Sequence, residues 1–567
     1  MNKAIAISIA AFLALLILFS GCVTPDNGEA GSFALSGLAA DKIIVTEAVP
    51  KYEAGKEVAN YNSAFDKQTI DVKNGNAEIA LGKNPVFIEL DGSYPKADLA
   101  SYEESPFGFH PANVLIQGYS DNEFADAANI GIKFARQGLY VFWFLVQQDI
   151  NLQDYDFSEY DGQWKNVPEN INILANIDIA PSPLISPREN PQRDPSERER
   201  ALRYVKENSF LPSDEEKYAA FVHAAVERYD GDGVDDMPGL KNPVRYWQVG
   251  NEPPSGLNNY AEFLKLTYDA IKESCARCKV LIGGVPGMPP ASEYISQFDS
   301  SYLPILNDLP GLGKSFDIFD FHWYGNATGD YKGAEEAYAH IKQKIDALGL
   351  SPEEYWITEM GAYSGDPAGA DVKYQTEAQQ AGDYLKRFVF SLSLGVKKIF
   401  PAFGLAEGFK RNDGYFDHTG LIYDGIGSND LGAGVKKLGY YTYKLMAEKL
   451  EGSDWGNVEV VRNGTGNIYV YKFYRKDLGK SIYVAWQDDS EEATDETTWK
   501  PESEGDVKGK CGDGICGPVE EEKGICPEDC TGETEGAGAG GAMQGKCGDG
   551  VCGPVEKEKG ICPEDCG

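Results

Sequence analysis

Two short segments of this chain each end in a glutamate that is placed for catalysis. The first reads YWQVGNE over residues 246–252, and the second reads YWITE over residues 355–359. Each is an aromatic and β-branched run, which predicts a buried parallel strand that delivers a carboxylate to its C-terminal end. Two carboxylates that face one sugar are the minimum equipment for breaking a glycosidic bond. Glu252 and Glu359 are therefore the candidate catalytic pair.

The segments that must position this pair alternate between strand and helix patterns over residues 105–452. This rhythm predicts an α/β fold, a (β/α)8 TIM barrel of eight strands with long loops. Strands are expected at 105–110, 130–136, 171–180, 243–250, 280–284, 316–321, 355–358 and 397–403. Helices are expected at 215–229, 258–274, 334–348, 377–393 and 432–450.

Short β patterns flank the barrel on both sides. Residues 36–104 alternate apolar and polar positions with hairpin signals, and residues 453–500 return to short strands. We expect these N-terminal and C-terminal β segments to pair into a β-sandwich beside the barrel.

The N-terminus has the layout of an export signal. An apolar run over residues 4–19 is followed by Ser20-Gly21-Cys22, and it is short for a membrane-spanning helix. We predict a lipoprotein-type signal peptide over residues 1–21, lipidation of Cys22 and a tether over residues 22–35. A plain signal peptide and an uncleaved anchor are the alternatives. All three place the rest of the chain outside the cytoplasm, secreted or anchored to a membrane at the cell surface.

Cysteine usage agrees with export. Residues 501–567 hold two copies of the pattern C-x4-C-x9-C-x3-C, over 510–530 and 546–566, with a Gly/Ala linker between them. Units so small lack a hydrophobic core and need cross-links to fold. Disulfides are favoured over a four-cysteine zinc site in an exported chain. The repeats either bind a cell-surface partner or serve as spacers. The disulfide candidates here are Cys511, Cys516, Cys526, Cys530, Cys547, Cys552, Cys562 and Cys566.

Two further motifs lie in the barrel region. Cys275 and Cys278 are predicted to form a small structural disulfide, with redox chemistry or half a zinc site as the alternative. Asp230, Asp232 and Asp235 alternate with glycines as in a calcium loop, although the glutamate at the end of an EF-hand loop is missing. The alternative for these aspartates is a solvated acidic turn.

The overall charge excludes one class of partner. The 567 residues carry a formal net charge of −37, which repels a nucleic-acid backbone and disfavours binding to an anionic membrane by charge alone. Their aromatic content of 12% suits both core packing and a sugar-binding groove.

The ordered motifs resemble glycoside hydrolase clan A, the retaining (β/α)8 glycosidases, and among them the β-xylosidase/α-iduronidase family and its uncharacterised relatives. The resemblance covers about residues 105–450. It rests on Asn251-Glu252-Pro253, on FHWY over residues 321–324, and on TEMG over residues 358–361.

The resemblance implies roles for the catalytic residues. Glu359 would be the nucleophile and Glu252 the general acid/base, while Asn251 would hold the sugar 2-hydroxyl. Tyr324 would donate a hydrogen bond to Glu359, and Arg136 would keep that carboxylate ionised. A retaining enzyme needs its two carboxyl groups about 5–5.5 Å apart.

Four more residues are predicted to contact substrate. His322 belongs to the His-x-Tyr motif, and His110 ends the first strand; a packed core histidine is the alternative for each. Trp323 is either a sugar platform or a core residue. Phe403 is the nearby substitute for the tryptophan that many clan members carry after the eighth strand.

The predicted function is that of an exported, retaining glycoside hydrolase that cleaves O-glycosidic bonds in a polysaccharide or oligosaccharide. No cofactor is required for this reaction, and structural calcium at the aspartate loop stays a possible addition. The alternative is a non-catalytic carbohydrate-binding or adhesion protein at the cell surface, because a barrel fold alone does not confer activity.

Overall fold

The structure is a computed structural model of the chain. It describes residues 31–52, 56–98, 104–185, 195–207, 209–253, 259–368, 372–426 and 430–488. The chain divides into two compact units, Met1–Trp499 and Lys500–Gly567, and every described residue belongs to the first. The predicted signal peptide, the lipidation site Cys22 and the two cysteine repeats lie outside the described residues.

Eight parallel strands form a barrel, and each lies where the sequence predicts a strand. In order around the sheet they are β6 (Gly108–Phe109), β7 (Phe134–Arg136), β9 (Asn172–Asp178), β10 (Tyr246–Val249), β11 (Lys279–Ile282), β12 (Ile318–Trp323), β13 (Glu354–Met360) and β14 (Lys398–Pro401). Parallel bridges from Phe107 to Ile399 and from His110 to Ala402 bring the last strand back to the first. A short strand, β8 (Val141–Phe142), pairs with β9 outside this ring. The (β/α)8 prediction is confirmed.

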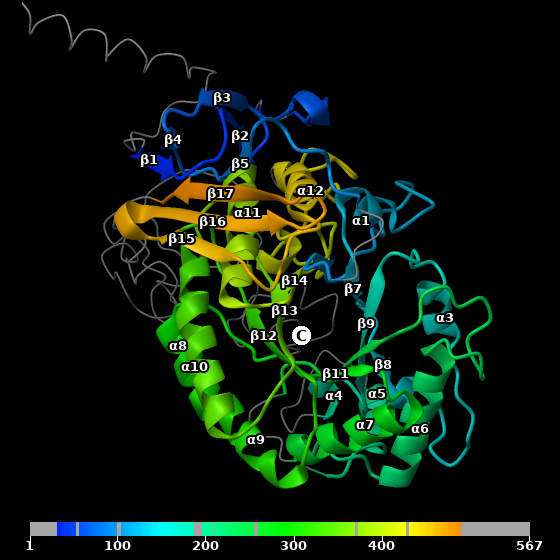
Figure 1. The fold of residues 1–567 in the computed structure, drawn as a ribbon. Coiled ribbons are helices and arrows are strands. Elements are labelled where there is room, and N and C mark those ends of the chain that lie inside the picture. The colour runs from blue at the N-terminus through cyan, green and yellow to red at the C-terminus, as the bar shows by residue number, and fades with distance from the viewer. Residues whose placement is uncertain are drawn as a thin grey trace, which may run out of the picture. The chain divides into compact units, whose positions relative to one another are not determined.

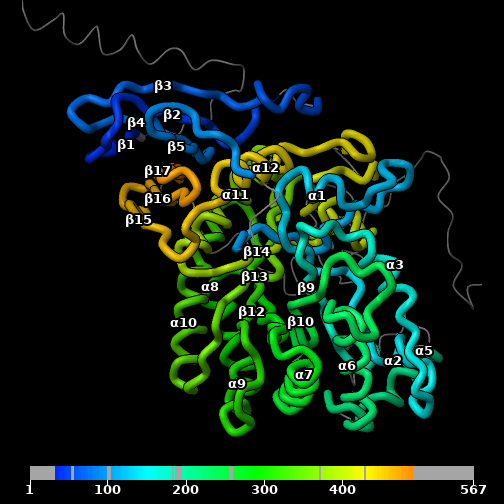
Figure 2. The backbone as a smooth tube through the Cα atoms, turned by 45° about the vertical axis from the view of Figure 1, so that its right-hand side comes forward, coloured from blue at the N-terminus to red at the C-terminus, as the bar shows by residue number. Residues whose placement is uncertain are grey.

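Helices follow the strands and lie outside the ring (Figures 1 and 2). Their ends follow local chemistry: the Asp214 side chain caps the backbone N–H of Lys217, and Thr376 forms a capping box with Gln379. The described helices are α1 (Ala125–Ile130), α2 (Trp143–Val146), α3 (Ser158–Trp164), α4 (Ser182–Ile185), α5 (Pro195–Leu202), α6 (Glu215–Tyr229), α7 (Tyr260–Ser274), α8 (Ala291–Gln297), α9 (Leu303–Asp308), α10 (Gly333–Ala347), α11 (Glu377–Leu394) and α12 (Leu438–Leu450).

The barrel interior is built in layers, because every second residue of a strand points inward. One layer is apolar, and it consists of Phe134, Leu174, Leu281, Ile318, Trp356 and Phe400. Two residues further along the strands comes a buried polar layer, which includes Arg136, Asn176, Gln248, Asp320 and Thr358. The candidate catalytic residues stand just beyond this polar layer, at the carboxyl ends of the strands. The apolar layer thus closes the barrel beneath the site.

The flanking segments pair with each other, as predicted. Strand β17 (Lys480–Gln487) runs antiparallel to β5 (Val86–Leu90), which joins the two ends of the described chain in one sheet. Figures 1 and 2 show the N-terminal strands in blue beside the C-terminal strands in orange. The six-stranded sheet is completed by β16 (Ile468–Arg475), β15 (Glu459–Asn463), β2 (Lys42–Glu47) and β3 (Lys67–Asp71).

A small second sheet covers one face of this sheet. It consists of β1 (Gly31–Ser36) and β4 (Asn76–Leu81), so the last residues of the predicted tether form a strand instead. Apolar side chains of both sheets, such as Ile79 and Ile88, share one buried cluster. The arrangement is a small sandwich beside the barrel.

The other face of the six-stranded sheet packs on the barrel. On β17, Trp486 faces this way, and its indole N–H donates a hydrogen bond of 2.8 Å to the hydroxyl of Tyr331. Just beyond the strand, the Asp488 carboxylate lies 2.8 Å from Lys386 and 2.7 Å from Lys332. This face of the six-stranded sheet therefore belongs to the barrel's buried cluster, through residues such as Tyr471, Val484 and Trp486, while the cluster between the two sheets of the sandwich is separate.

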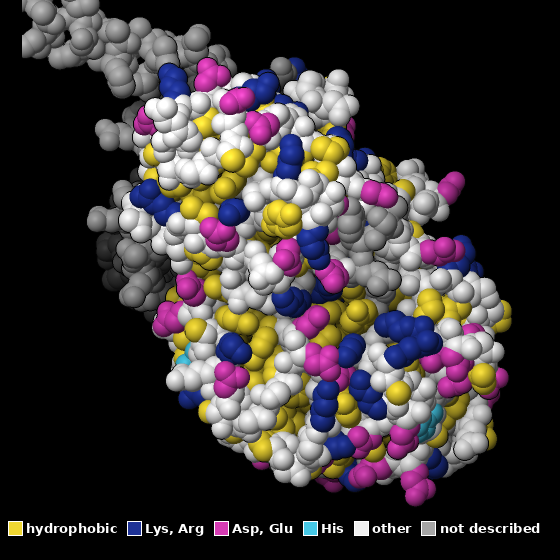
Figure 3. Space-filling view, in the orientation of Figure 1, with side chains coloured by type: hydrophobic (Ala, Val, Ile, Leu, Met, Phe, Trp, Pro, Cys, Tyr) yellow, Lys and Arg dark blue, Asp and Glu magenta, His cyan; other side chains and the backbone are white. Residues whose placement is uncertain are grey.

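On the face drawn in Figure 3, Lys and Arg side chains are interspersed with those of Asp and Glu over the described residues. Within the part of the chain that the structure describes, none of the helices has the combination of length and apolar character that crossing a membrane requires.

Candidate active site

Glu359 lies at the end of β13 and is almost fully buried. Its Oε1 is 2.6 Å from Nη1 of Arg136 on β7, and its Oε2 accepts a hydrogen bond from the hydroxyl of Tyr324. Nε2 of His110 lies 4.0 Å from Oε1. Both oxygens of this carboxylate therefore have donors, one from β7 across the barrel and one from the residue that follows the adjacent strand β12.

A bulge explains why two consecutive residues of β13 reach the interior. Asp320 and His322 of β12 pair with Trp356 and Glu359 of β13, so β13 carries an extra residue in this stretch. The pairing with β14 shows the same shift. Bulges re-aim side chains next to active sites, and this one lets both Thr358 and Glu359 point inward.

The neighbouring cations hold Glu359 in its charged form. Burial by itself favours the neutral acid, but the positive charges of His322 and Arg136 outweigh burial and lower the pKa of Glu359 to about 2. For His110, burial and then the charge of Arg136 lower the pKa to about 3, so its ring is neutral near pH 7. Glu359 is thus a buried, ionised carboxylate.

Glu252 lies in a tight turn after β10. Gly250 and Glu252 have φ angles of 67° and 42°, and a positive φ is unusual for a residue with a side chain. Such strain clusters at functional sites. The Glu252 side chain is 35% exposed, much more than that of Glu359. One carboxylate oxygen of Glu252, one of Glu359 and a ring nitrogen of His322 lie within 4.8 Å of one another.

His322 lies between the two glutamates. Its Nδ1 is 2.6 Å from Oε1 of Glu252 and 3.5 Å from Oε2 of Glu359. Burial disfavours the imidazolium, but the carboxylates of Glu359, Asp320 and Glu252 outweigh burial and raise the pKa of His322 to about 10. A cation therefore lies between the carboxyl groups of Glu252 and Glu359.

Arg136 connects Glu359 to β10 and to the turn that follows it. Besides Glu359, its guanidinium donates from Nε to Oε1 of Gln248 at 2.8 Å and from Nη2 to Oδ1 of Asn251 at 2.6 Å. Because its oxygen is engaged by Arg136, the Asn251 amide is fixed next to Glu252 in the turn.

An aromatic wall extends from the site along the loop after β14. The ring of Phe403 stacks on that of Tyr324, with centroids 6.3 Å apart, and also contacts Phe409 and Phe416. The ammonium of Lys410 lies 4.8 Å above Phe403. Phe403 is half-buried and Phe409 is exposed, so this wall offers ring surface to the C–H face of a sugar.

Trp323 is not part of this wall. Strand alternation turns it to the opposite side of β12 from His322, where it packs on Tyr294 and donates its indole N–H to the Asp330 carbonyl at 3.0 Å. Of the two readings left open by the sequence, the packing role fits this position and the sugar platform does not.

Several residues of the site were not predicted from the sequence. The ring of Tyr140 lies beside the Arg136 guanidinium, with Cζ 5.5 Å from the ring centroid. Gln248, Asp320 and Thr358 form the polar layer beneath the glutamates. The available signal was the spacing along the strands. Gln248 stands four residues before Glu252, and Asp320 stands two residues before His322.

The acidic loop after α6 differs from the predicted calcium site. Asp230 and Asp232 lie close to Asp236, which takes the place predicted for Asp235. The Asp236 carboxylate accepts the backbone N–H groups of Gly231 and Gly233 at 2.9 and 2.8 Å. Asp236 thus binds amides of its own loop, and one carboxylate oxygen of each of the three aspartates lies within 4.8 Å of the others.

The cysteine pair at the end of α7 forms the predicted disulfide. The Cys275 and Cys278 sulfur atoms are 2.02 Å apart.

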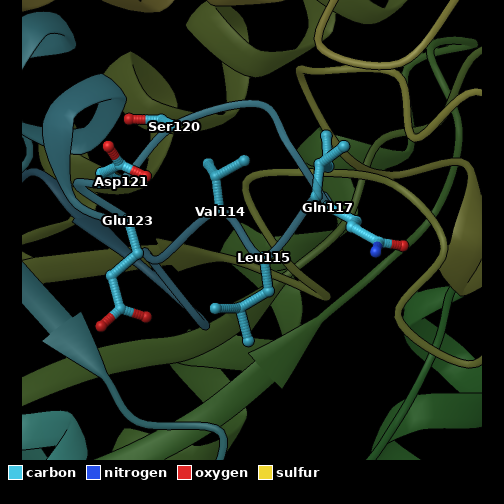
Figure 4. A pocket seen from close by; sticks show the side chains of 7 residues that line it. Val114, Leu115, Gln117, Ser120, Asp121 and Glu123 are labelled. Atoms are coloured by element: carbon cyan, nitrogen blue, oxygen red, sulfur yellow. The ribbon is translucent and has the colours of Figure 1, made fainter.

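A separate hollow of about 420 Å³ lies along the loop between β6 and α1. Figure 4 shows the side chains around it, among them Leu115, Asp121 and Glu123. None of the predicted site residues lines this hollow.

No family model matches the sequence, and no curated protein does so either. Solved structures resemble the chain at low identity. A family 39 glycoside hydrolase from the gut symbiont Bacteroides cellulosilyticus is 15% identical, with 81% of this chain and 88% of that chain covered and a TM-score of 0.49. A monomeric β-xylosidase from Caulobacter crescentus is 14% identical (67% and 75% covered, TM-score 0.40). A psychrophilic family 10 endo-β-1,4-xylanase is also 14% identical (61% and 99% covered, TM-score 0.40). All three scores lie below 0.5, so the barrel assignment rests on the strand pairing of this chain itself.

Proposed function

We propose that this protein is a retaining glycoside hydrolase in which Glu359 is the nucleophile and Glu252 is the general acid/base. The observation that carries the proposal is the pair of carboxylates within 4.8 Å at the mouth of the barrel, one buried and held by Arg136, the other more exposed. This separation supports retention, since inverting enzymes hold their carboxyl groups about 6.5–9.5 Å apart to admit a water.

The first step forms a glycosyl-enzyme ester. A Glu359 oxygen attacks the anomeric carbon while Glu252 gives a proton to the departing glycosidic oxygen. Glu359 suits attack because it is ionised, and its hydrogen bonds to Arg136 and Tyr324 orient it. Glu252 suits proton transfer because it is exposed enough to meet a leaving group.

The second step reverses the roles. Glu252, now a carboxylate, takes a proton from water, and the water oxygen attacks the anomeric carbon. The ester bond to Glu359 breaks, and the sugar leaves with its original configuration. Both steps use carboxylates alone, so this chemistry requires no cofactor.

The proposed substrate is a polysaccharide or oligosaccharide, with the aromatic wall of Phe403, Phe409 and Phe416 as the surface that receives a sugar ring. We also propose that the enzyme acts outside the cytoplasm, anchored through a lipid on Cys22. The apolar run before Cys22 supports this location. The cysteine repeats would then contact a cell-surface partner or act as spacers.

The test uses the chain from residue 23 onward, incubated with a panel of polysaccharides and aryl glycosides. Release of reducing sugar by the wild type and not by Glu359→Ala supports the proposal. The exposed Glu262 on α7 provides the matched control, and Glu262→Ala should match the wild type. Proton NMR of the first sugar released distinguishes retention from inversion. Equal release by wild type and Glu359→Ala would remove the assignment, and binding without release would favour the carbohydrate-binding alternative.

A further inference from the structure

Asp320 is a buried carboxylate in the barrel interior that the steps above do not use. It lies on β12, two residues before His322, and it has no solvent exposure. Its Oδ1 accepts the Thr358 backbone N–H at 2.9 Å. Its Oδ2 accepts the Thr358 hydroxyl at 2.5 Å and the Gln248 amide at 2.6 Å. All these partners donate, which is the environment that a carboxylate requires.

The ring of His322 has an acceptor at each nitrogen. Nδ1 meets Glu252 at 2.6 Å, while Nε2 lies 3.3 Å from the Thr358 hydroxyl oxygen and 3.4 Å from Oδ2 of Asp320. The hydrogen of the Thr358 hydroxyl points to Asp320, so its oxygen faces Nε2 as an acceptor. A ring that donates from both nitrogens is an imidazolium.

The close approach of His322 Nε2 and Asp320 Oδ2 requires a glycine at position 284. A Cβ atom at Gly284, just after β11, would collide with Nε2 of His322 and lie 2.7 Å from Oδ2 of Asp320. Any larger residue there would push the carboxylate and the ring apart. The close approach of Asp320 and His322 therefore depends on the neighbouring strand as well as on their own.

Charged and titratable groups from several elements surround the ring. Glu359 on β13, Glu252 after β10 and Asp320 on β12 all raise the pKa of His322 against the effect of burial. The other groups at the site are Arg136 on β7, His110 after β6, Tyr140 after β7 and Tyr324 after β12. Asp320 is the carboxylate on the Nε2 side of the ring, and Glu252 is the carboxylate on the Nδ1 side.

We propose that Asp320 is a positioning residue that holds His322 as a doubly donating imidazolium between the two catalytic carboxylates. In this state His322 occupies Oε1 of Glu252 and leaves Oε2 as the oxygen that carries the transferred proton. Its charge also separates Glu252 from Glu359. The inference rests on the proposed function only for the roles of those two glutamates.

The direct test is the titration of His322, followed by NMR on chain labelled with ¹⁵N-histidine. The chain has five histidines, so the imidazole signals can be resolved, and His322→Gln identifies the one in question. Asp320→Asn should move the titration of His322 to lower pH by about one unit or more, because an opposite charge at this range has that effect. The basic limb of the kcat/KM profile should move in the same direction.

The matched control is Asp317→Asn, which removes a buried carboxylate just before the same strand, at the opposite end of the barrel. Asp317 contacts Lys272 and Lys314, so this variant perturbs the fold without touching the site. It should leave the His322 titration in place. A shift of equal size in the Asp317 variant would overturn the proposal, since any loss of buried charge would then suffice.

Unchanged titration of His322 in Asp320→Asn would also overturn the proposal. If that variant does not fold, Thr358→Val replaces it, because it removes the hydroxyl that contacts both Asp320 and Nε2, and it should shift the titration in the same direction. No shift there would equally reject the inference. The NMR experiment needs no substrate, so it separates a failure of this proposal from a failure of the glycosidase proposal.

Discussion

Nη1 of Arg136 lies 2.6 Å from Oε1 of Glu359, and neither side chain is more than 3% exposed. Moving a charge from water into the protein interior costs free energy. The Arg136 guanidinium offsets this cost with hydrogen bonds to Glu359, Gln248 and Asn251. One arginine therefore positions the proposed nucleophile and also fixes the residue beside the proposed acid/base.

Substitution of this arginine should affect stability and activity separately. Arg136→Met leaves Glu359 buried without its partner, and we expect the free energy of unfolding to fall by about 3–5 kcal/mol. Arg136→Lys keeps the charge but loses the fork that reaches Gln248 and Asn251, and should lower kcat/KM by roughly 100-fold, the loss of about two hydrogen bonds to a charged group. Urea unfolding and steady-state kinetics measure the two effects. An active Met variant of normal stability would contradict the role assigned to the ion pair.

The charge on Glu359 should make stability depend on pH. Its pKa in the folded protein is about 2, below the ordinary value of 4.5. A carboxyl group whose pKa is lowered by folding adds stability above its unfolded pKa, and this stability is lost as the pH falls towards the folded pKa. The wild type should therefore lose more stability than Glu359→Gln between pH 6 and pH 3, by about 2 kcal/mol. Urea unfolding across this range tests it, with exposed Glu262→Gln as the control. Parallel curves for wild type and Glu359→Gln would refute the prediction.

The hydrogen bond from Tyr324 to Glu359 should contribute to catalysis more than to folding. In Tyr324→Phe the ring still stacks on Phe403, so the melting temperature should change little. Glu359, the proposed nucleophile, loses a donor, which should lower kcat/KM by about tenfold or more, since a hydrogen bond to a charged group is worth about 1.5–3 kcal/mol. Tyr363→Phe is the control, because Tyr363 packs nearby on Tyr415 and donates to the Lys373 carbonyl instead. A similar kinetic loss in both variants would show that general packing, and not the bond to Glu359, matters here.

The barrel and the meeting of Glu252 and Glu359 at its mouth could be predicted because their signals are local. Strand runs such as the one ending at Glu359 carry their own pattern of apolar and β-branched residues, and parallel strands bring their carboxyl ends to one mouth. The N-terminal and C-terminal β segments carry local strand patterns too, but their pairing joins β5 to β17, which lie far apart in the sequence, and no local pattern encodes it.

The remaining features depend on contacts that spacing does not encode. The bulge in β13 sets which residues face inward, and a strict alternation would place Thr358 and Glu359 on opposite sides. The third member of the acidic cluster of Asp230 and Asp232 is Asp236 and not Asp235. The positive φ angle at Asp235, a turn that spacing does not encode, accompanies this arrangement. The proposed role of Asp320 depends on its distance from His322, which the sequence does not give. From the sequence alone, an aspartate within a buried strand indicates a structural residue.

Two aromatic residues with different surroundings give the last prediction. Phe403, on the loop after β14, is half-buried in the aromatic wall beside the site, whereas Trp323 of β12 packs against α8 on the outside of the barrel. Phe403→Ala should raise KM for a glycan severalfold or more, because stacking on a ring is lost, and should leave folding nearly intact. Trp323→Ala should instead reduce the free energy of unfolding by about 3–5 kcal/mol, as for other buried tryptophans, with KM close to that of the wild type. Kinetics below the melting temperature of both variants, with urea unfolding alongside, compare the two. A raised KM in the Trp323 variant together with an unchanged KM in the Phe403 variant would reject the aromatic wall as the sugar surface.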